Sequence, residues 1–293
     1  MCAMTPPGPR HGFVEANGIR FHYVEQGEGP LVLLLHGFPE CWYSWRLQLP
    51  VLAEAGYHAV APDLRGYNLS DKPRSGYGVA TLVADVEAIG RSFGADSAHV
   101  VGHDWGGIIA WQIASCRPAF VRTLVTMNAP HPSAFARYAR RSPAQLLKSS
   151  YMFFFQIPRL PEWLLCRDRA AAIASSFPRA AVRCDVFTDA DLEVYREAFL
   201  RPGAARCALN YYRQAVRQGS AVLPTTPVLV PTLVLWGEGD PVLNSAMNAH
   251  LDDWVRNLTY RPIPDCGHWT QQERPDVVNA ELVAWLNSHS PYP

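Results

Sequence analysis

The sequence of 293 residues lacks the features of a membrane, secreted or nucleic-acid-binding protein. Its longest purely aliphatic run, Leu31 to Leu35, is far shorter than the roughly 20 apolar residues of a membrane-spanning helix. Lys and Arg number 26, and so do Asp and Glu, so no excess of positive charge favours nucleic acid. The first residues contain no apolar segment of a secretory signal. We therefore expect a globular cytoplasmic protein with neither nucleic acid nor a membrane as a partner.

The cysteines and histidines do not form the patterns that bind metals or build disulfides. The seven cysteines are an odd number, and no two of them stand in a Cys-x-x-Cys pair. The spacing of His99 and His103 could suit two metal ligands, but both fall on a run that is predicted to be a buried strand. We therefore expect reduced thiols, no metal and no cofactor.

What the sequence does contain is a hydrophobic content of 48%, enough for a sizeable core, and alternating strand and helix signals. An Asn-Gly pair at 17–18 between two strand-like runs predicts a hairpin. Short apolar runs predict buried strands, and helical spacing of apolar residues predicts helices between them. The expected strands are 31–35, 58–61, 98–101 and 121–127, and the expected helices are 79–93 and 106–115. This order implies a mostly parallel sheet.

The character of the chain changes between residues 131 and 222. Strand signals disappear there, while Arg, Ala, Phe and Tyr recur at helical spacing with several proline breaks. The alternation then resumes, with strands expected at 232–236 and 258–263 and helices at 245–254 and 275–287. We therefore predict an α/β fold with a mostly parallel central sheet. Its core is formed by residues 1–130 and 223–293, and residues 131–222 are an inserted helical segment, here called the cap.

The most specific pattern lies at residues 102–107 (Gly-His-Asp-Trp-Gly-Gly), between a predicted strand and a predicted helix. Glycines two residues before and two or three residues after Asp104 permit a sharp turn. Such a turn, known as a nucleophile elbow, raises one side chain above the sheet at a helix N-terminus, where negative charge is favoured. An aspartate that only caps the helix would not need these glycines. The pattern therefore predicts Asp104 as a catalytic nucleophile.

A nucleophile of this kind needs an acid and a histidine that follow it in the chain, in that order. Asp240 follows the predicted strand 232–236, and His268 lies in a glycine-containing loop after the next strand. The carboxyl ends of neighbouring parallel strands meet at one edge of the sheet, so these side chains are expected near Asp104. Glu238 and Asp265 are rival candidates for the acid.

The reaction at such a nucleophile also needs donors for the negative charge that develops on oxygen. The loop after the strand 31–35 should supply one backbone N–H, and the residue after the nucleophile should supply the other. We assign these two donors to Phe38 and Trp105. His36, at the start of the same loop, is expected to be structural.

These motifs together resemble those of the epoxide hydrolases, a family with the α/β-hydrolase fold. Residues 36–40 (His-Gly-Phe-Pro-Glu) resemble its oxyanion loop, and residues 102–107 resemble its elbow with an aspartate nucleophile. Residues 265–270 resemble its histidine loop, and residues 128–132 resemble the passage from its core into its cap. The resemblance covers nearly the whole chain.

Two further segments of the cap resemble those that carry a pair of tyrosines in that family. Residues 151–156 align Tyr151 with the first tyrosine, and residues 210–213 align Tyr212 best with the second. Tyr211 is an adjacent alternative, and either tyrosine could instead be ordinary packing within the cap. The resemblance implies that Tyr151 and Tyr212 stabilise the alkoxide that leaves when the epoxide opens.

The implied reaction converts an epoxide and water to a vicinal diol through an alkyl ester on Asp104. A carboxylate nucleophile suits this chemistry, because a serine would give an ether that water does not easily cleave. His268, oriented by Asp240, would then activate the water that hydrolyses the ester. We expect a small apolar epoxide as the substrate of a monomer or homodimer. The expected pocket walls are Phe38, Pro39, Trp105, Phe153, Phe154, Phe155 and Trp269, although at least two of the cap phenylalanines are expected to be ordinary core packing.

Three other functions are compatible with parts of this pattern. A haloalkane dehalogenase would use the same triad, with Trp105 as a halide donor, but Phe38 has no side-chain donor and paired tyrosines would have no task. A dehalogenase of the fluoroacetate type should carry an arginine beside the nucleophile, where this chain has Trp105. A ligand receptor without catalysis would not need the complete set of Asp104, Asp240 and His268.

Overall fold

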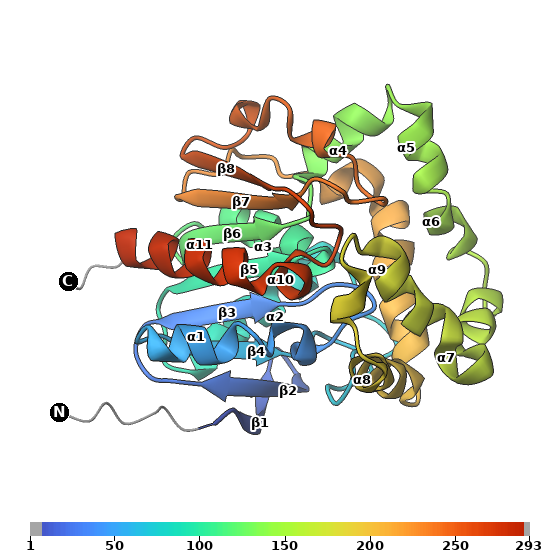
Figure 1. Ribbon diagram of the computed structural model, residues 1–293, viewed down its shortest axis with the longest axis horizontal. Helices are drawn as coiled ribbons and strands as arrows, with labels where there is room; N and C mark the ends of the chain where they lie inside the picture. Colours follow the sequence, from blue (N-terminus) through green and yellow to red (C-terminus); the bar gives the residue numbers. More distant parts are fainter. Residues whose placement is uncertain (1–7, 290–293) are drawn as a thin grey trace.

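A computed structural model describes residues 8–289, and its centre is one eight-stranded sheet (Figure 1). The strand order is β1-β2-β4-β3-β5-β6-β7-β8, and every neighbouring pair from β4 to β8 is parallel, whereas β1 and β2 are antiparallel to their neighbours. The strands are β1 (Arg10–Ala16), β2 (Ile19–Gln26), β3 (Leu31–Leu35), β4 (His58–Pro62), β5 (Ala98–His103), β6 (Val121–Met127), β7 (Thr232–Gly237) and β8 (Leu258–Ile263). The predicted α/β fold with a mostly parallel sheet is confirmed.

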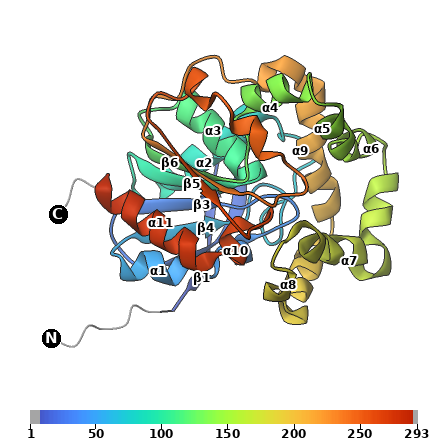
Figure 2. The same cartoon turned by 45° about the horizontal axis from the view of Figure 1, so that its top comes forward.

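Helices cover both faces of the sheet, which explains why the central strands are short and continuously apolar. On β3, Val32 and Leu34 belong to the core under α1 (Leu49–Glu54) and α11 (Pro275–Ser288). Leu33 and Leu35 point to the opposite face, under α2 (Val79–Ser92) and α3 (Trp105–Cys116). Figure 2 shows these two helical layers on either side of the strands. The predicted hairpin joins β1 and β2, with positive φ at both turn residues, Asn17 and Gly18.

All the helices between β6 and β7 gather beyond the carboxyl ends of the parallel strands (Figure 1). Proline at the first turn of α4, α5 and α7 fits the start of a helix, and the Thr188 side chain caps α8 in a capping box with Asp191. The helices are α4 (Pro132–Ala139), α5 (Pro143–Lys148), α6 (Tyr151–Phe154), α7 (Leu160–Ala180), α8 (Asp189–Leu200) and α9 (Ala204–Gln218), with 3₁₀ turns η2 (Cys184–Val186) and η3 (Gly219–Val222). No strand interrupts them.

One predicted helix, at residues 245–254, is wrong. The segment forms two short 3₁₀ turns, η4 (Ser245–Asn248) and η5 (Leu251–Asp253). His250 between them has a φ of 62°, in the left-handed region, and this interrupts any continuous helix. Two further short elements, η1 (Trp42–Trp45) and α10 (Thr270–Glu273), lie in loops near the carboxyl ends of the strands.

The described part of the chain also bears on the expectations about membrane-spanning helices and about the cysteines. None of its helices is long and apolar enough to cross a membrane. Its six cysteines are free thiols, and Cys2 lies outside the described residues.

Candidate active site

Asp104 occupies the sharp turn between β5 and α3, with φ 46° and ψ −118°. Two glycines are required there by close backbone contacts. A Cβ atom on Gly102 would lie 2.4 Å from the carbonyl oxygen of Gly106, and one on Gly106 would lie 2.1 Å from that of Leu35. Since real Cβ atoms do not approach backbone so closely, only glycine lets β5 and α3 pack this tightly. The turn lifts the Asp104 side chain to the carboxyl edge of the sheet.

His268 lies between two carboxylates at this edge. Its Nδ1 is 2.8 Å from Oδ2 of Asp240, a hydrogen-bond distance, and its Nε2 is 3.8 Å from Oδ2 of Asp104. The rival acids predicted from the sequence, Glu238 and Asp265, are both exposed to solvent, and neither bonds to His268 within the described structure. The structure therefore brings together Asp104, Asp240 and His268.

The Asp240 carboxylate is held in place by four donors. Oδ1 accepts the backbone N–H groups of Val242 and Leu243, at 2.7 and 3.0 Å. Oδ2 accepts the Asn128 side-chain amide at 2.7 Å as well as the histidine. Burial by itself would raise the pKa of Asp240, but these partners outweigh it and hold the pKa below its usual value. Asp240 is therefore a fixed negative charge beside the imidazole.

These carboxylates change the acidity of the histidine. Burial alone would lower the pKa of His268, but the charge and hydrogen bond of Asp240, followed by the charges of Asp104 and Glu40, raise it to about 9. Burial also raises the pKa of Asp104, and the nearby imidazole of His268 offsets only part of that effect. Asp104 and His268 thus form an ion pair in a site that is largely shielded from water.

The predicted oxyanion donors also converge on Asp104. The backbone N–H of Phe38 donates to Oδ1 of Asp104 at 2.8 Å. The N–H of Trp105 also stabilises the carboxylate charge and lowers the pKa of Asp104. Oδ1 is therefore the oxygen held by the backbone, while Oδ2 is the one nearest His268.

A buried polar network behind the histidine was not predicted from the sequence. Oε2 of Glu40 lies 2.8 Å from Nδ1 of His103, and Nε2 of His103 lies 2.8 Å from the carbonyl oxygen of His268. The side-chain amides of Gln271 and Gln272 both donate to Oε1 of Glu40 at 3.0 Å. Glu40 ends the motif 36–40, and His103 directly precedes Asp104, so their places beside the candidate catalytic motifs were the available signal.

The histidines once considered as metal ligands have other partners. His99 Nδ1 is 2.7 Å from the Thr123 hydroxyl, on the neighbouring strand, and His103 belongs to the network with Glu40. Within residues 8–289 no group of three or more His, Cys, Asp and Glu side chains could hold a metal ion. His36 contacts the backbone of its own loop and of Leu64.

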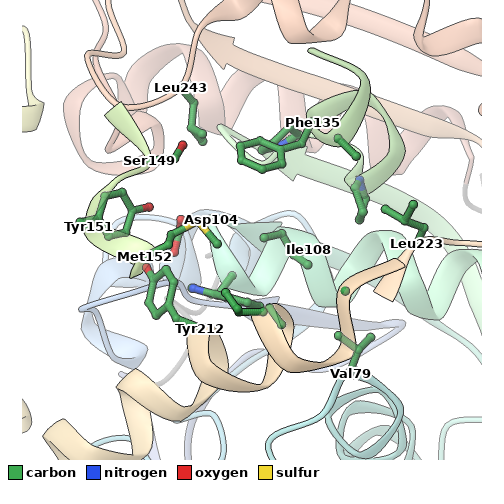
Figure 3. A pocket seen from close by; sticks show the side chains of 17 residues that line it. Val79, Asp104, Ile108, Phe135, Ser149, Tyr151, Met152, Tyr212, Leu223 and Leu243 are labelled. Atoms are coloured by element: carbon green, nitrogen blue, oxygen red, sulfur yellow. The ribbon is translucent and has the colours of Figure 1, made fainter. Parts of the chain in front are cut away.

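The two cap tyrosines predicted by the resemblance meet over Asp104. Tyr151 on α6 and Tyr212 on α9 line one cavity with Asp104, and their ring centroids are 5.7 Å apart. In Figure 3 both hydroxyls point toward the Asp104 carboxylate. The neighbouring Tyr211 points away and donates its hydroxyl to the carbonyl oxygen of Arg65 at 2.8 Å. Between the two adjacent tyrosines of α9, only Tyr212 reaches the cavity.

Both cavity tyrosines are weaker acids than an ordinary tyrosine. Burial is the main cause that raises the pKa of Tyr151, and the charge of Asp104 raises it further. The pKa of Tyr212 is raised well above its usual value by burial, by Tyr151 and by Asp104. Two neutral phenols therefore face the carboxylate as hydrogen-bond donors.

The cavity has a volume of about 270 Å³ and is almost entirely apolar away from Asp104 and the tyrosines (Figure 3). Its lining comes from the first residue of α2, from α3, α4, α6, α9 and η3, and from the loops beside them. The lining residues are Val79, Asp104, Trp105, Ile108, Pro130, Pro132, Phe135, Ala136, Ser149, Tyr151, Met152, Tyr212, Ala215, Val216, Gly219, Leu223 and Leu243. An apolar molecule could therefore reach Asp104 with its polar end directed at the tyrosines.

Most of the aromatic residues expected to wall this cavity lie elsewhere, and Trp105 is the one that lines it. Phe38 and Phe155 instead pack against the ring of Tyr212, with centroid distances of 5.3 and 5.1 Å. Phe154 packs against Phe155, and Pro39 is buried in the loop after β3. These side chains support the tyrosine rather than the cavity surface.

The remaining two expected walls are directed away from the nucleophile. The Trp269 ring stacks on Phe177 at 4.5 Å and donates its N–H to the Phe177 carbonyl oxygen. Phe153 is 65% exposed, because the single turn of α6 that directs Tyr151 inward directs Phe153 outward. The walls that the sequence did not identify, such as Phe135 and Leu243, come from α4 and the loop after β7.

Comparison with known proteins agrees with this geometry. The alpha/beta hydrolase fold family matches residues 30–275. The chain is 41% identical over 300 residues to "Epoxide hydrolase 4" of Mus musculus, covering 99% of this chain and 83% of the relative. It is 41% identical over 298 residues to "Epoxide hydrolase 3" of Xenopus tropicalis, covering 97% and 80%.

The structure is also similar to a solved one. It matches the crystal structure of an epoxide hydrolase from Bacillus megaterium, determined in complex with an inhibitor, with a TM-score of 0.88. The two are 30% identical, and the match covers 94% of this chain and 100% of the other. The chain therefore belongs to the α/β-hydrolase superfamily and, within it, to the epoxide hydrolases.

Proposed function

We propose that this enzyme converts an epoxide and water to a vicinal diol through a covalent ester on Asp104. The observation that carries the proposal is the placement of Tyr151 and Tyr212 in one apolar cavity with Asp104. A nucleophile and two donors that face each other are what ring opening requires. One side attacks carbon while the other stabilises the oxygen that departs.

In the first step, Oδ2 of Asp104 attacks one epoxide carbon. A carbon–oxygen bond forms to Oδ2, the ring carbon–oxygen bond breaks, and its electron pair moves to the epoxide oxygen. Tyr151 and Tyr212 stabilise this oxygen, and one of them gives it a proton. The His268 imidazolium then passes its proton to the tyrosinate that remains, which leaves the ring neutral for the second step. The N–H of Phe38 holds Oδ1 during the attack, so Oδ2 is directed at the substrate, and the N–H of Trp105 also bonds to the carboxylate.

Ring opening moves the negative charge from the Asp104 carboxylate to the oxygen that faces the two tyrosines. The charge of Asp104 is one cause of the raised pKa of each tyrosine. Ester formation removes that charge and creates a new one on the epoxide oxygen. A charged oxygen accepts stronger hydrogen bonds than a neutral ether oxygen, so both phenols bind it more tightly as the ring opens, and this strongly basic alkoxide takes up a proton.

In the second step, water attacks the ester carbonyl carbon, and the negative charge that develops on Oδ1 is stabilised by the donors of Phe38 and Trp105. His268 takes the proton of this water as general base, while Asp240 orients the ring and stabilises its positive charge. Collapse of the tetrahedral intermediate breaks the bond between the ester carbon and the alkyl oxygen, and the second proton of the attacking water moves to that oxygen, which leaves His268 protonated as in the free enzyme. The diol leaves, and the Asp104 carboxylate is restored.

The proposal also assigns a task to each part of the chain. Residues 1–130 and 223–293 form the catalytic core, and residues 131–222 form a cap that supplies Tyr151, Tyr212 and much of the apolar wall. The apolar lining suits an epoxide with an alkyl or aryl substituent. Haloalkane dehalogenation has less support, because a halide leaves as a stable anion and would not use two phenols.

A direct test measures diol formation from styrene oxide beside halide release from a bromoalkane. We expect the diol at a rate that requires Asp104, and no halide above the level of an Asp104→Ala variant. Halide release without diol formation would replace the epoxide proposal with the dehalogenase one. Absence of both products, with the fold intact by circular dichroism, would favour a receptor without catalysis.

A further inference from the structure

The zero net charge of the chain hides a separation of charge between its two parts. Residues 131–222 contain 14 Lys and Arg against 7 Asp and Glu, a net charge of +7, and the rest of the chain contains 12 against 19, a net charge of −7. Helices α4 to α9 lie together beyond one edge of the sheet (Figures 1 and 2). The molecule therefore has a positive end and a negative end, and the positive end would be attracted to an anionic surface.

The positive end also carries an unusual number of exposed apolar side chains. Among the residues whose exposure is described, seven of the fourteen exposed large hydrophobic side chains fall between 146 and 164. The exposed fraction is 75% for Leu147, 65% for Phe153 and 58% for Trp163. We call the full set the cap patch: Leu146, Leu147, Phe153, Ile157, Leu160, Trp163 and Leu164. Exposed apolar side chains gathered in this way mark an interaction surface.

The cap patch lies on the outer side of the helical segment. Its residues belong to α5, α6, the loop between α6 and α7, and the first turns of α7. In Figures 1 and 2 these elements form the right-hand side of the molecule, beyond the carboxyl ends of the parallel strands. Within residues 8–289 the seven side chains keep between 38% and 75% of their surface exposed.

Basic side chains without acidic partners accompany the patch. Arg140, Arg141, Lys148 and Arg159 are exposed, and none of them forms an ion pair with any residue that the structure describes. The only acidic residue between 140 and 166 is Glu162, and its carboxylate is 2.7 Å from the Arg213 guanidinium. The positive charge around the patch is therefore not neutralised by the protein itself.

We propose that the cap patch docks on the surface of an anionic lipid bilayer without crossing it. Leucine, phenylalanine and tryptophan beside lysine and arginine are the composition of helices that lie in a membrane interface. Apolar side chains enter the boundary of the acyl chains, while the basic ones meet the lipid phosphates. A second copy of this chain fits less well, because it would bring one positive cap against another. This inference revises the expectation, drawn from the lack of a long apolar run, that no membrane is a partner.

The docking would place the proposed active site next to its substrate. The single turn of α6 presents Tyr151 to the cavity and Phe153 to the outside. An apolar epoxide dissolves in the bilayer rather than in water, so docking at α6 concentrates it near the cavity. This last consequence rests on the proposed function, whereas the docking itself does not.

The test is co-sedimentation of the whole protein with vesicles. One set contains phosphatidylcholine mixed with phosphatidylserine, and the other contains phosphatidylcholine alone. We expect the protein to sediment with the mixed vesicles and to dissociate as salt is raised, because each basic side chain near such a surface contributes about fivefold to binding. Binding to pure phosphatidylcholine vesicles should be at least about tenfold weaker.

Two double variants separate the apolar and basic contributions. Leu147→Ser with Trp163→Ser removes exposed apolar area, and Lys148→Glu with Arg159→Glu reverses two charges. Each pair should weaken binding by at least about tenfold. Leu229→Ser, at a side chain that is 58% exposed but lies in the other part of the chain, is the matched apolar control and should bind as wild type. Arg256→Glu is the matched charge control.

Three outcomes would overturn the proposal. They are failure of the wild type to sediment with mixed vesicles, unchanged binding of both double variants, and loss of self-association in the variants without any change in vesicle binding. The last outcome, seen by sedimentation velocity, would make the patch a dimer interface. Hydrolysis of a small water-soluble epoxide should be unchanged in all these variants. Membrane docking and catalysis can therefore fail independently.

Discussion

The ring of His268 is hydrogen-bonded to Asp240 at 2.8 Å but lies 3.8 Å from the Asp104 carboxylate, beyond hydrogen-bond distance. The imidazole is therefore oriented by its hydrogen bond to Asp240 and interacts with Asp104 through charge alone. Both charges contribute to its pKa of about 9, so the ring is protonated in the free enzyme at neutral pH. Esterification of Asp104 neutralises one of the two charges. The ring then loses its proton more easily and becomes the base that the second step requires.

The first prediction tests this electrostatic coupling directly. In Asp104→Asn the negative charge is absent before any substrate is bound, so the pKa of His268 should fall below about 9. The expected direction follows because Asp104 favours the protonated ring, and its removal favours the neutral ring. Titration of the His268 ring by nuclear magnetic resonance would measure it. The exposed Glu238→Gln is the control and should leave the titration unchanged, whereas an unchanged titration in Asp104→Asn would refute the coupling.

The second prediction concerns the covalent intermediate. His268→Gln removes the general base of the second step but leaves the Asp104 carboxylate in place. Alkylation should therefore proceed while hydrolysis of the ester stalls. Intact-protein mass spectrometry after mixing with an epoxide should show one added substrate mass, located on Asp104 by peptide mapping. Steady turnover at the wild-type rate in this variant would exclude His268 from the mechanism.

The third prediction follows the oxygen atoms. The proposed water attacks the ester carbonyl carbon and not the substrate, so a single turnover in labelled water should place the label in Asp104. The diol of that turnover receives the former carboxylate oxygen. Label in the first-turnover diol, with none in Asp104, would instead mean direct attack of water on the epoxide.

The sequence could predict the positions of the catalytic motifs because each is a local pattern. The glycines around Asp104 and the strands before Asp240 and His268 are read within a few residues, and their order in the chain fixes which loops meet. The parallel sheet follows from the same alternation of strands and helices. The split of 245–254 into two turns depends on the left-handed backbone of His250, which no periodic pattern reveals.

The sequence could not predict contacts that depend on how distant segments pack. Glu40 and His103 are 63 residues apart, and His103 and the His268 carbonyl are 165 residues apart. The prediction of the residues that line the cavity was mostly wrong for a similar reason. Aromatic residues near Tyr151 were natural candidates, but the direction of a single helical turn decides which of them faces inward. Phe153 faces solvent for that reason, while Phe135 reaches the cavity from another helix.

The fourth prediction concerns the buried network around Glu40. Its carboxylate accepts hydrogen bonds from Gln271, Gln272 and the Gly37 N–H and also contacts His103. Glu40→Gln replaces one acceptor oxygen with an amide donor, which leaves buried donors facing each other. The free energy of unfolding should fall by about 1–3 kcal/mol, measured by urea denaturation. Glu238→Gln, at an exposed position, is the control and should change stability by less than about 0.5 kcal/mol.

The last prediction separates the two tyrosines of the cavity from their neighbour on α9. Removal of one donor to a developing oxyanion typically costs on the order of 3 kcal/mol, or about a hundredfold in rate. Tyr151→Phe and Tyr212→Phe should each slow alkylation by about that factor, and the double variant should be nearly inactive. The two effects should not be additive, because both hydroxyls serve the same oxygen. Stopped-flow quenching of tryptophan fluorescence can follow alkylation, since Trp105 lies beside Asp104 in the cavity.

Tyr211→Phe is the matched control for this series, because it removes a hydroxyl from the adjacent residue of the same helix. That hydroxyl bonds to the Arg65 carbonyl and not to the cavity, so the variant should lose about 1 kcal/mol of stability with little change in alkylation rate. The opposite result, with Tyr211→Phe inactive and Tyr212→Phe normal, would show that Tyr211 is the donor and that the assignment to Tyr212 is wrong. If neither Tyr151→Phe nor Tyr212→Phe slows epoxide opening, phenol donation is not part of the reaction. Halide release from bromoalkanes by the same variants would then favour the dehalogenase, since a halide leaves without a proton.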